Sequence, residues 1–314
     1  MTLAQRATYL GYSAGWAAVR RMPEKAAYGL FDRIADTSWR RRTPSVERLE
    51  ANLRRAIPDA SEPELRTASR AGMRSYMRYW CDAFRLPGWD AARIDSFRIT
   101  NEEVLTDAHA TGRGVVLALP HQGNWDHAGA WASRNVSPIN TVAEKLEPVQ
   151  LFESFVAYRE SLGMRIFGLG DPGVFDELAA ALRAGGLVAL LADRDLSHRG
   201  IDVTFLGEAA RFPGGPAALA VDTGAVLLPV DLFWEDGNCA TLLSEVVTPP
   251  QGTRDERIQA ATQAVADQLS IGISRHPEDW HMLQKLFLAD LDPERLARRD
   301  AAGRAAGSEP SGQV

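Results

Sequence analysis

From residue 96 onward the chain alternates short apolar runs with stretches of helical periodicity. Strand-length runs with few polar side chains occur at GVVLALP (114–120), INTVAE (139–144), MRIFGL (164–169), LVALLAD (187–193) and AVLLPVDLFW (225–234). Strands that are apolar on both faces are typical of parallel sheets with helices on both sides. A further run, CATLLSEVV (239–247), follows the turn EDGN and predicts a hairpin. The pattern predicts an α/β fold with a mixed central sheet flanked by helices.

Residues 1–95 show helical periodicity interrupted by prolines. SVERLEANLRRAI predicts a helix capped by Ser45, and SEPELRTASRAGMRSYMRYWCDAF a second helix capped by Ser61. A late helix is expected at DERIQAATQAVADQLSIGISRH (255–276), and the composition after Asp292 predicts a disordered tail. We therefore expect a helical region at 1–95 packed on an α/β domain at 96–291, followed by a tail at 292–314.

The charge of the chain is unevenly distributed. Residues 1–100 hold 18 Lys and Arg against 11 Asp and Glu, whereas the remainder holds 17 against 30. No motif that reads nucleic acid accompanies the basic third, so a nucleic-acid partner is not expected. An anionic membrane surface fits better, because one predicted helix face is both aromatic and basic: Tyr9, Tyr12, Trp16 and Arg20. Two alternatives stay open, a solvated arginine-rich surface and packing of this face on the rest of the protein.

The uncharged stretch at 7–19 is too short to span a bilayer. The N-terminal helices are therefore expected to form a membrane-associating cap that lies on the membrane surface without crossing it.

His121 and Asp126 follow the first apolar run, in ALPHQGNWDHAGAW (118–131). Open sheets place their ligands at the carboxyl ends of strands. Gly123 gives the turn room, and Asp126 is expected in the first turn of a helix. From there its carboxylate would accept the Nδ1 proton of His121 and leave Nε2 as a base. No Ser or Cys nucleophile accompanies the pair, which raises the question of whose hydroxyl the base would activate.

A glycine-rich segment offers an alternative function. GLGDPG (168–173) matches the G-x-G-x-x-G pattern of dinucleotide sites, and Asp193 follows it at a suitable distance. However, Asp171 would place a carboxylate where a pyrophosphate needs backbone amides, and Pro172 removes one of those amides. A dinucleotide-dependent oxidoreductase is thus a disfavoured alternative, and a non-catalytic lipid-binding protein is another.

Several segments resemble the membrane-associated glycerolipid acyltransferases. HQGNWD is similar to their H-x4-D signature. Its Asn-Trp pair resembles the branch containing the lauroyl and myristoyl transferases of lipid A synthesis, and so do ERLEANLRRAIPDAS (47–61), FLGEAARFPGGPAALAVDTGAVLLPV (205–230) and HPEDWHMLQKLF (276–287). Within that branch, DRDLSHRGIDVTFLGE (193–208) looks closest to the mycobacterial members that acylate phosphatidylinositol mannosides. FPGGPA stands where many relatives with glycerophosphate acceptors carry a P-E-G-T-R type block, which favours a larger glycolipid acceptor.

The resemblance implies an O-acyltransferase. A long acyl chain, palmitoyl by this resemblance, would move from acyl-CoA to a mannose hydroxyl of a mannosylated phosphatidylinositol lipid. His121 would deprotonate that hydroxyl, so no acyl-enzyme is needed. No metal and no cofactor beyond the donor substrate acyl-CoA are expected. The enzyme would be peripheral, at the cytoplasmic face of the cell membrane.

Polar residues at two predicted strand ends are candidates for binding the acceptor. Asp193, Arg194 and Asp195 follow an apolar strand and would hold acceptor hydroxyls and help to orient His121, or form a surface ion pair. Asp193 is accordingly grouped with His121 and Asp126 as catalytic. Glu144, at the end of another strand, is a similar candidate.

Three further residues are candidates on physical grounds. Arg159 shares a helical stripe with apolar residues, so its guanidinium must pair with a ligand anion or with a structural carboxylate. Arg199 would meet the phosphates of CoA. Asp222 interrupts an apolar stretch and would pair with a nearby arginine or with acceptor hydroxyls. The acyl chain would need an apolar groove lined by the sheet and the N-terminal helices.

Overall fold

A seven-stranded sheet forms the centre of the protein. The computed structural model describes residues 3–145, 147–195, 200–246 and 251–291. The strands lie in the order β1-β9-β8-β2-β5-β3-β4, and neighbours are parallel except β8 and β9. Their bounds are β1 (Arg98–Ile99), β2 (Val115–Leu119), β3 (Ile139–Ala143), β4 (Arg165–Gly168), β5 (Leu187–Leu191), β8 (Val226–Trp234) and β9 (Asn238–Leu242). A separate antiparallel pair is formed by β6 (Ile201–Phe205) and β7 (Glu208–Phe212).

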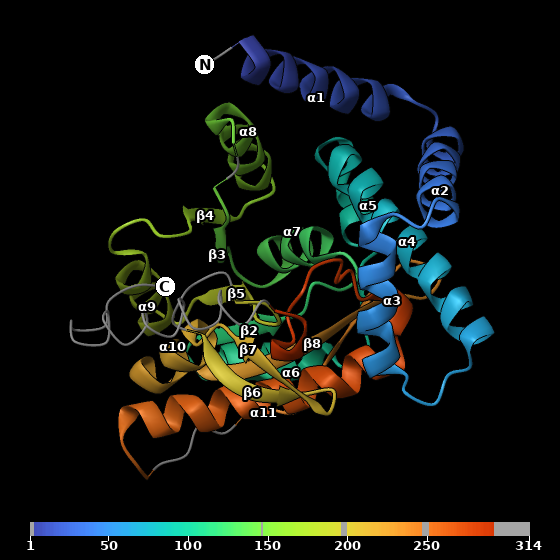
Figure 1. The fold of residues 1–314 in the computed structure, drawn as a ribbon. Helices are drawn as coiled ribbons and strands as arrows, with labels where there is room; N and C mark the ends of the chain where they lie inside the picture. Colours follow the sequence, from blue (N-terminus) through green and yellow to red (C-terminus); the bar gives the residue numbers. More distant parts are fainter. Residues whose placement is uncertain (1–2, 146, 196–199, 247–250, 292–314) are drawn as a thin grey trace.

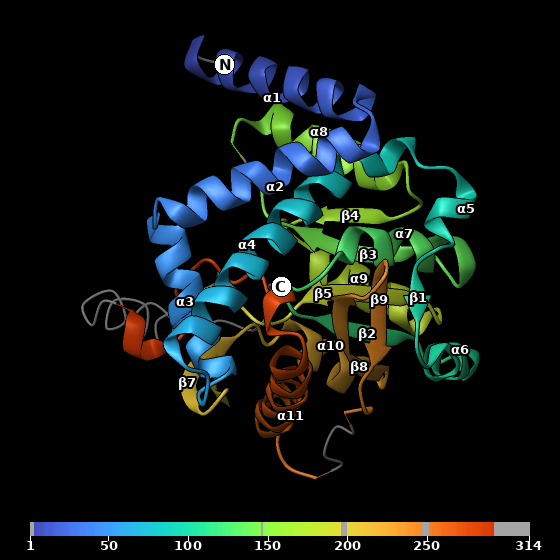
Figure 2. The same ribbon diagram turned by 90° about the vertical axis from the view of Figure 1, so that its right-hand side faces the viewer.

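Helices cover both faces of the sheet. The helices of the described residues are α1 (Leu3–Arg21), α2 (Glu24–Arg40), α3 (Pro44–Ala56), α4 (Glu62–Arg85), α5 (Ala91–Ile94), α6 (Glu102–Ala110), α7 (Trp125–Asn135), α8 (Val149–Glu160), α9 (Val174–Arg183), α10 (Gly215–Thr223) and α11 (Arg254–Arg275), with short 3-10 turns at η1 (Leu86–Gly88), η2 (Pro277–Asp279) and η3 (Leu288–Asp290). In Figures 1 and 2, α11 lies below the sheet, whereas α1 and α8 lie together above it.

Alternate residues of the central strands belong to different cores. Val116 and Ala118 of β2 pack in a cluster with α9, α10 and α11, whereas Leu117 and Leu119 pack in a second cluster with α6 and α7. This alternation follows from the two-residue period of a strand, and the burial of both faces explains why the runs contain almost no polar residues. The predicted α/β fold with a mixed sheet and N-terminal helices is confirmed.

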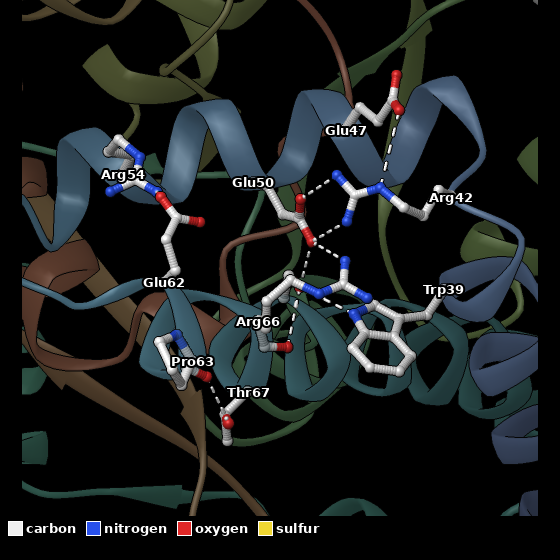
Figure 3. Close-up of polar contacts among 10 residues, drawn as sticks. Trp39, Arg42, Glu47, Glu50, Arg54, Glu62, Pro63, Arg66 and Thr67 are labelled. Carbon is white, nitrogen blue, oxygen red and sulfur yellow. Dashed lines mark hydrogen bonds and ion pairs between the residues drawn. The ribbon is translucent and has the colours of Figure 1, made fainter.

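The N-terminal helices are held together by ion pairs around a buried carboxylate. Glu50 of α3 accepts hydrogen bonds from Arg42 Nη2 (2.9 Å), from Arg66 of α4 and from Ser69 (2.9 Å), as Figure 3 shows for the two arginines. Burial raises the pKa of Glu50, but the hydrogen bonds from Ser69, Arg42 and Arg66 outweigh it, so the pKa lies below its ordinary value. Part of the basic charge of this region is therefore structural.

The aromatic face of α1 packs on the protein. Trp16 donates from Nε1 to the Phe84 carbonyl (2.8 Å), and its ring lies 5.3 Å from that of Phe155 of α8. Tyr12 contacts the same two phenylalanines edge-on. Of the alternatives left open for this face, the structure shows packing, because neighbouring helices supply aromatic partners. Among the described residues, none of the helices combines the length and hydropathy needed to cross a bilayer.

The observed helix caps and strands differ from the prediction in several details. Ser61 caps α4 as predicted, with its N–H donating to Glu64 (2.8 Å). The cap of α3 is Thr43, not Ser45, because Pro44 occupies the first helical position, which a residue without an N–H suits. The β8–β9 hairpin is confirmed. The pair β6–β7 and the two-residue β1 were not expected. The predicted tail at 292–314 lies outside the described residues.

Candidate active site

His121 lies in the loop between β2 and α7, beside the end of β5. Leu119 of β2 pairs with Leu191 of β5, and His121 and Asp193 each follow two residues later. Parallel register therefore brings these two side chains together at the carboxyl edge of the sheet. Asp193 Oδ1 lies 2.5 Å from His121 Nδ1, and its Oδ2 accepts the backbone N–H of His121 at 2.9 Å. The carboxylate thus fixes both the ring and the backbone of the histidine.

Asp193 is held as an anion inside the protein. It is fully buried, and Trp280 Nε1 donates to its Oδ2 at 2.9 Å. Burial raises the pKa of Asp193, but the charge of His121 and the hydrogen bonds from His121 and Trp280 outweigh this, so the pKa lies below its ordinary value. An ionised carboxylate only accepts, so Nδ1 carries a proton, and in the neutral form of the imidazole Nε2 holds the lone pair. His121 is thereby prepared to act as a base.

Asp126 does not hold the histidine, contrary to the expectation that it accepts the Nδ1 proton. It lies in the first turn of α7 and is buried, and it accepts Arg159 Nε at 2.7 Å, Arg159 Nη2 at 3.3 Å and the Tyr79 hydroxyl at 3.0 Å. The reason is the offset along the chain. Because α7 starts at Trp125, Asp126 lies within the helix and its carboxylate contacts Tyr79 of α4 and Arg159 of α8, while His121 stays in the loop before the helix.

The Arg159–Asp126 pair resolves the alternatives for Arg159 in favour of a structural ion pair. Burial lowers the pKa of Arg159, but the adjacent Asp126 and Tyr79 outweigh this and raise it above its ordinary value. Tyr79 in turn stacks on Trp125, with ring centroids 4.0 Å apart. Asp126 therefore ties α7 to α4 and α8, and so fixes the helix that follows the His121 loop.

The remaining predicted binding residues separate into two groups. Arg194 Nη2 lies 3.6 Å from Glu144 Oε2, at the carboxyl ends of β5 and β3, and both residues line the same cavity as His121. Asp195 follows them in the chain and is half-buried. Asp222 lies on α10, where Arg254 binds it through Nε (2.8 Å) and Nη2 (2.7 Å), so the first of its two alternatives holds and it is not part of the cavity.

Arg199 lies outside the described residues. The glycine-rich segment at 168–173 forms the turn between β4 and α9, where Asp171 pairs with Lys145. A Cβ at Gly168 would clash with the Asp171 carboxylate. Gly168 thus makes room for a carboxylate of its own loop, which accounts for that glycine without a dinucleotide.

A cavity of about 290 Å³ extends from His121 between α7 and the sheet. An apolar cavity of about 150 Å³ accommodates a benzene ring, so this one holds roughly twice that volume of hydrocarbon. Its walls are mostly apolar and come from the strands, from α7 and from α4: Leu117, Leu119, Ala189, Ala128, Tyr76 and Trp80. The arrangement combines a base, its carboxylate and a space for an apolar chain.

Sequence reasoning missed two residues that complete the site, Trp280 and His281. Both lie in HPEDWHMLQKLF, which was singled out only for its resemblance. The His281 N–H donates to the His121 carbonyl (2.7 Å), and its ring forms part of the cavity wall. Burial, then the charges of His121 and Arg78, lower the pKa of His281 to about 3, so this imidazole is neutral at pH 7. No local pattern indicates these contacts, because the partners are far apart in the chain.

Comparison with known proteins shows the family to which the chain belongs. Residues 2–289 match the model of the bacterial lipid A biosynthesis acyltransferase family. The chain is 43% identical over 301 residues to the phosphatidylinositol mannoside acyltransferase of Mycolicibacterium smegmatis, covering 94% of this chain and 96% of the relative. It is 41% identical over 305 residues to the protein of the same name from Mycobacterium tuberculosis, covering 95% and 94%. The chain therefore belongs to the bacterial lipid A biosynthesis acyltransferase family.

Proposed function

We propose that this protein transfers a long fatty acyl chain from acyl-CoA to a mannose hydroxyl of a phosphatidylinositol mannoside. The observation that carries the proposal is the His121–Asp193 pair at one end of an apolar cavity. The acceptor is inferred from the relatives, whose names specify phosphatidylinositol mannosides and which match the chain nearly from end to end.

In the proposed reaction, His121 Nε2 takes the proton of the mannose hydroxyl as its oxygen attacks the thioester carbonyl. The tetrahedral intermediate collapses with cleavage of the C–S bond, and the CoA thiolate leaves and receives the proton from the imidazolium. Asp193 stabilises the imidazolium between these steps, because it is a buried anion in contact with Nδ1. The acceptor hydroxyl is itself the nucleophile, so no acyl-enzyme forms.

The polar residues at the end of the cavity fit a donor and an acceptor of this kind. Arg194 and Glu144 are paired only at 3.6 Å, and the Glu144 side chain is 57% exposed. A guanidinium in this position suits a phosphate, either of CoA or of the acceptor lipid, and the carboxylate suits sugar hydroxyls. The acyl chain would occupy the space between α7 and the sheet, where Leu117, Leu119 and Ala189 face it.

The protein is proposed to act on the anionic, cytoplasmic face of the cell membrane. Leu10 of α1 is 62% exposed, and Leu30 and Ile34 of α2 are 39% and 42% exposed. Large apolar side chains on two adjacent helices, with arginines beside them, suit the headgroup layer. Only part of the basic charge is available to lipids, because the buried Asp36 binds other arginines of this region, Arg70 and Arg74.

The test of the reaction is thiol release from palmitoyl-CoA, with and without a mannosylated phosphatidylinositol, for the wild type, His121→Ala and the control His109→Ala on α6. We expect acceptor-stimulated release that yields acylated glycolipid, slow hydrolysis without acceptor, and loss of both in His121→Ala alone. Equal activity of His121→Ala and the wild type would refute the mechanism. Robust turnover of the donor without acylated glycolipid would refute the acceptor assignment.

The test of membrane binding is flotation with vesicles of anionic phospholipid. Leu10→Asp combined with Leu30→Asp should abolish flotation. The control is Ile271→Asp, which places a charge on another exposed apolar side chain (44% exposed) of α11, a helix on the other side of the sheet from α1 (Figure 1). Equal loss of flotation in both proteins, or in neither, would contradict the assignment of this surface.

A further inference from the structure

A second hollow, of about 500 Å³, lies between α1, α8 and η1, apart from the cavity beside His121. The two helices lie together in Figures 1 and 2, and among the described residues none borders both spaces. Aromatic side chains separate them, because Trp16 packs on Phe155, which lines the first cavity. The hydrogen bond from Trp16 Nε1 to the Phe84 carbonyl holds this partition in place. The hollow therefore belongs to the outer helices and is not an extension of the cavity.

One wall of the hollow is a single face of α1, along which residues follow one another at spacings of three, four and three: Leu10, Ser13, Ala17 and Arg20. Such spacings place side chains on the same side of a helix. The last three of these residues line the hollow. Leu10 continues the same face and is 62% exposed. The hollow thus begins one turn along the helix from a side chain that is proposed to enter the membrane.

Arg20 brings a positive charge to this hollow. Other arginines of the N-terminal helices are bound to carboxylates, as Arg70 and Arg74 are to Asp36. Arg20 is exposed, and no carboxylate among the described residues pairs with it. Its Nη2 lies 4.0 Å from the position that a Cβ on Gly88 would take, so the guanidinium reaches from α1 across to η1. A guanidinium placed in this way suits a phosphate, because its planar set of N–H groups matches the phosphate oxygens.

The opposite wall, from α8 and the turn after it, presents oxygens that accept hydrogen bonds. Ser154 Oγ donates to the Gln150 carbonyl (2.7 Å), and Ser161 Oγ donates to the Tyr158 carbonyl (2.6 Å). A hydroxyl has one proton and two lone pairs, so each oxygen whose proton is used in this way is left as an acceptor. Both serines line the hollow. A ligand that fills it therefore needs a negative group for the arginine and hydroxyl groups for the two serines.

We infer that this hollow binds the head group of an anionic membrane phospholipid whose phosphodiester carries a polyol, such as glycerol or inositol. The phosphate binds Arg20, and the hydroxyls of the polyol donate to the serines of α8. The volume is roughly three times that of a cavity that holds benzene, which leaves room for one ring and a phosphate. Choline offers no donor to the serines, and the ammonium of ethanolamine or serine head groups would place a second cation beside Arg20. The inference goes beyond the proposed reaction and rests only on the proposed attachment to a membrane.

The experiment measures binding to phosphatidylcholine vesicles that contain equal fractions of phosphatidylglycerol, phosphatidylinositol or phosphatidylserine. The three surfaces carry the same charge, so a preference among them reports the head group. The wild type should bind the two polyol lipids roughly tenfold more tightly than phosphatidylserine, which is about the worth of two hydrogen bonds to the serines. Arg20→Gln should remove this preference. Arg21→Gln is the matched control, because it removes the same charge from a residue that does not line the hollow, and it should weaken binding to all three surfaces equally.

Two further variants test hydrogen bonding and shape without a change of charge. Ser154→Ala combined with Ser161→Ala removes the two acceptors. Ala157→Leu fills the hollow from an exposed position on α8, where a larger side chain does not disturb the core. Both should abolish the preference for polyol lipids and leave binding to anionic vesicles in general. A wild type without the preference, or a preference that survives in these variants and in Arg20→Gln, overturns the inference.

Calorimetry distinguishes failure of this inference from failure of the proposed function. Dihexanoyl phosphatidylglycerol, kept below its micelle concentration, is titrated into His121→Ala and into His121→Ala with Arg20→Gln, so that neither turnover nor a membrane is needed. Saturable binding at one site that is lost with Arg20 supports the inference even if no glycolipid is acylated. Absence of binding, equal binding by the two proteins, or equally tight binding of inorganic phosphate overturns it, even if the wild type proves to be an active acyltransferase.

Discussion

Replacing Asp193 by asparagine should abolish catalysis while leaving the fold intact. Asparagine has the same shape, and its amide oxygen can occupy the position of Oδ2, which accepts both the His121 N–H and Trp280 Nε1. The amide nitrogen then replaces Oδ1 and faces His121 Nδ1. Because an NH2 group donates, Nδ1 must become the acceptor, and the imidazole proton moves to Nε2. The nitrogen that should take the substrate's proton would already carry one.

The size of the effect follows from this change of tautomer. In the serine-protease triad, the equivalent Asp-to-Asn change lowers kcat by about 10⁴ although the geometry is kept. We expect a loss of roughly 10³ to 10⁴ in kcat here, with a smaller change in KM, since the cavity walls are unaltered. Stability should fall by no more than about 1–3 kcal/mol, because all three hydrogen bonds remain, although each now involves a neutral amide in place of a carboxylate.

The assay is kcat and KM for palmitoyl-CoA at saturating acceptor, together with urea unfolding of each protein. Asp231→Asn is the matched control, because Asp231 is also a buried carboxylate beside this loop and accepts Gln122 Nε2 at 3.0 Å without contacting His121. The control should lose stability to a similar extent and keep its kcat within about tenfold. A folded Asp193→Asn protein with more than a tenth of the wild-type kcat would refute the tautomer argument.

Three further predictions concern other contacts of the site. Asp126→Asn leaves the Arg159 guanidinium without its anion and should lower the free energy of urea unfolding by about 3–5 kcal/mol. The double variant Asp126→Asn with Arg159→Met should lose less stability than the single variant, and equal losses would contradict a buried pair. Trp280→Phe removes the hydrogen bond that Trp280 Nε1 donates to the Asp193 carboxylate, and it should lower kcat by about tenfold with little change in KM. An unchanged kcat would contradict a role for this hydrogen bond in catalysis. His127 and His281 have pKa values of about 4 and 3, because burial favours their neutral forms. These histidines are protonated in the unfolded chain below about pH 6.5 but stay neutral in the folded protein, so acid favours unfolding. Between pH 6 and 5 the unfolding free energy should fall by ~1.4 kcal/mol per pH unit for each histidine. Urea titrations at several pH values measure this slope, and His127→Gln should remove about half of it.

The parts of the fold predicted best are those with a strong local signal. The run at 187–193 is uniformly apolar because β5 lies between two other strands and has both faces covered. The strand β6 was missed because Asp202 and Thr204 point to solvent and alternate with buried residues over only five positions. The two-residue β1 depends entirely on its pairing with β9, so the chain carries no signal of its own for it.

The candidate site was predicted in its residues but only partly in its connections, since Asp193 was expected to help to orient His121 while Asp126 was expected to bond to its Nδ1. The sequence indicated His121, Asp126 and Asp193, yet the nearest carboxylate in the chain was assigned to the histidine. Asp193 lies 72 residues away, and only the register between β2 and β5 brings it into contact. Strand order and register are decided by the packing of the whole sheet, and no segment of the sequence encodes them locally. For the same reason, the sequence could not decide whether Arg159 pairs with a ligand anion or with a structural carboxylate.

The segment that carries Trp280 and His281 has a consequence for the synthesis of the protein. Asn52 of α3 donates to the carbonyls of Met282 (2.7 Å) and Gln284 (3.0 Å), which follow it by 230 and 232 residues. A ribosome releases the N-terminal helices long before these partners exist. The apolar surfaces of α3 and α4 that will receive the segment therefore stay uncovered during most of translation, and such surfaces are prone to aggregation. His121 also lacks its backbone contact with His281 until then, so the candidate site is completed only near the end of synthesis. We expect folding to finish late, when this last segment docks on the N-terminal helices.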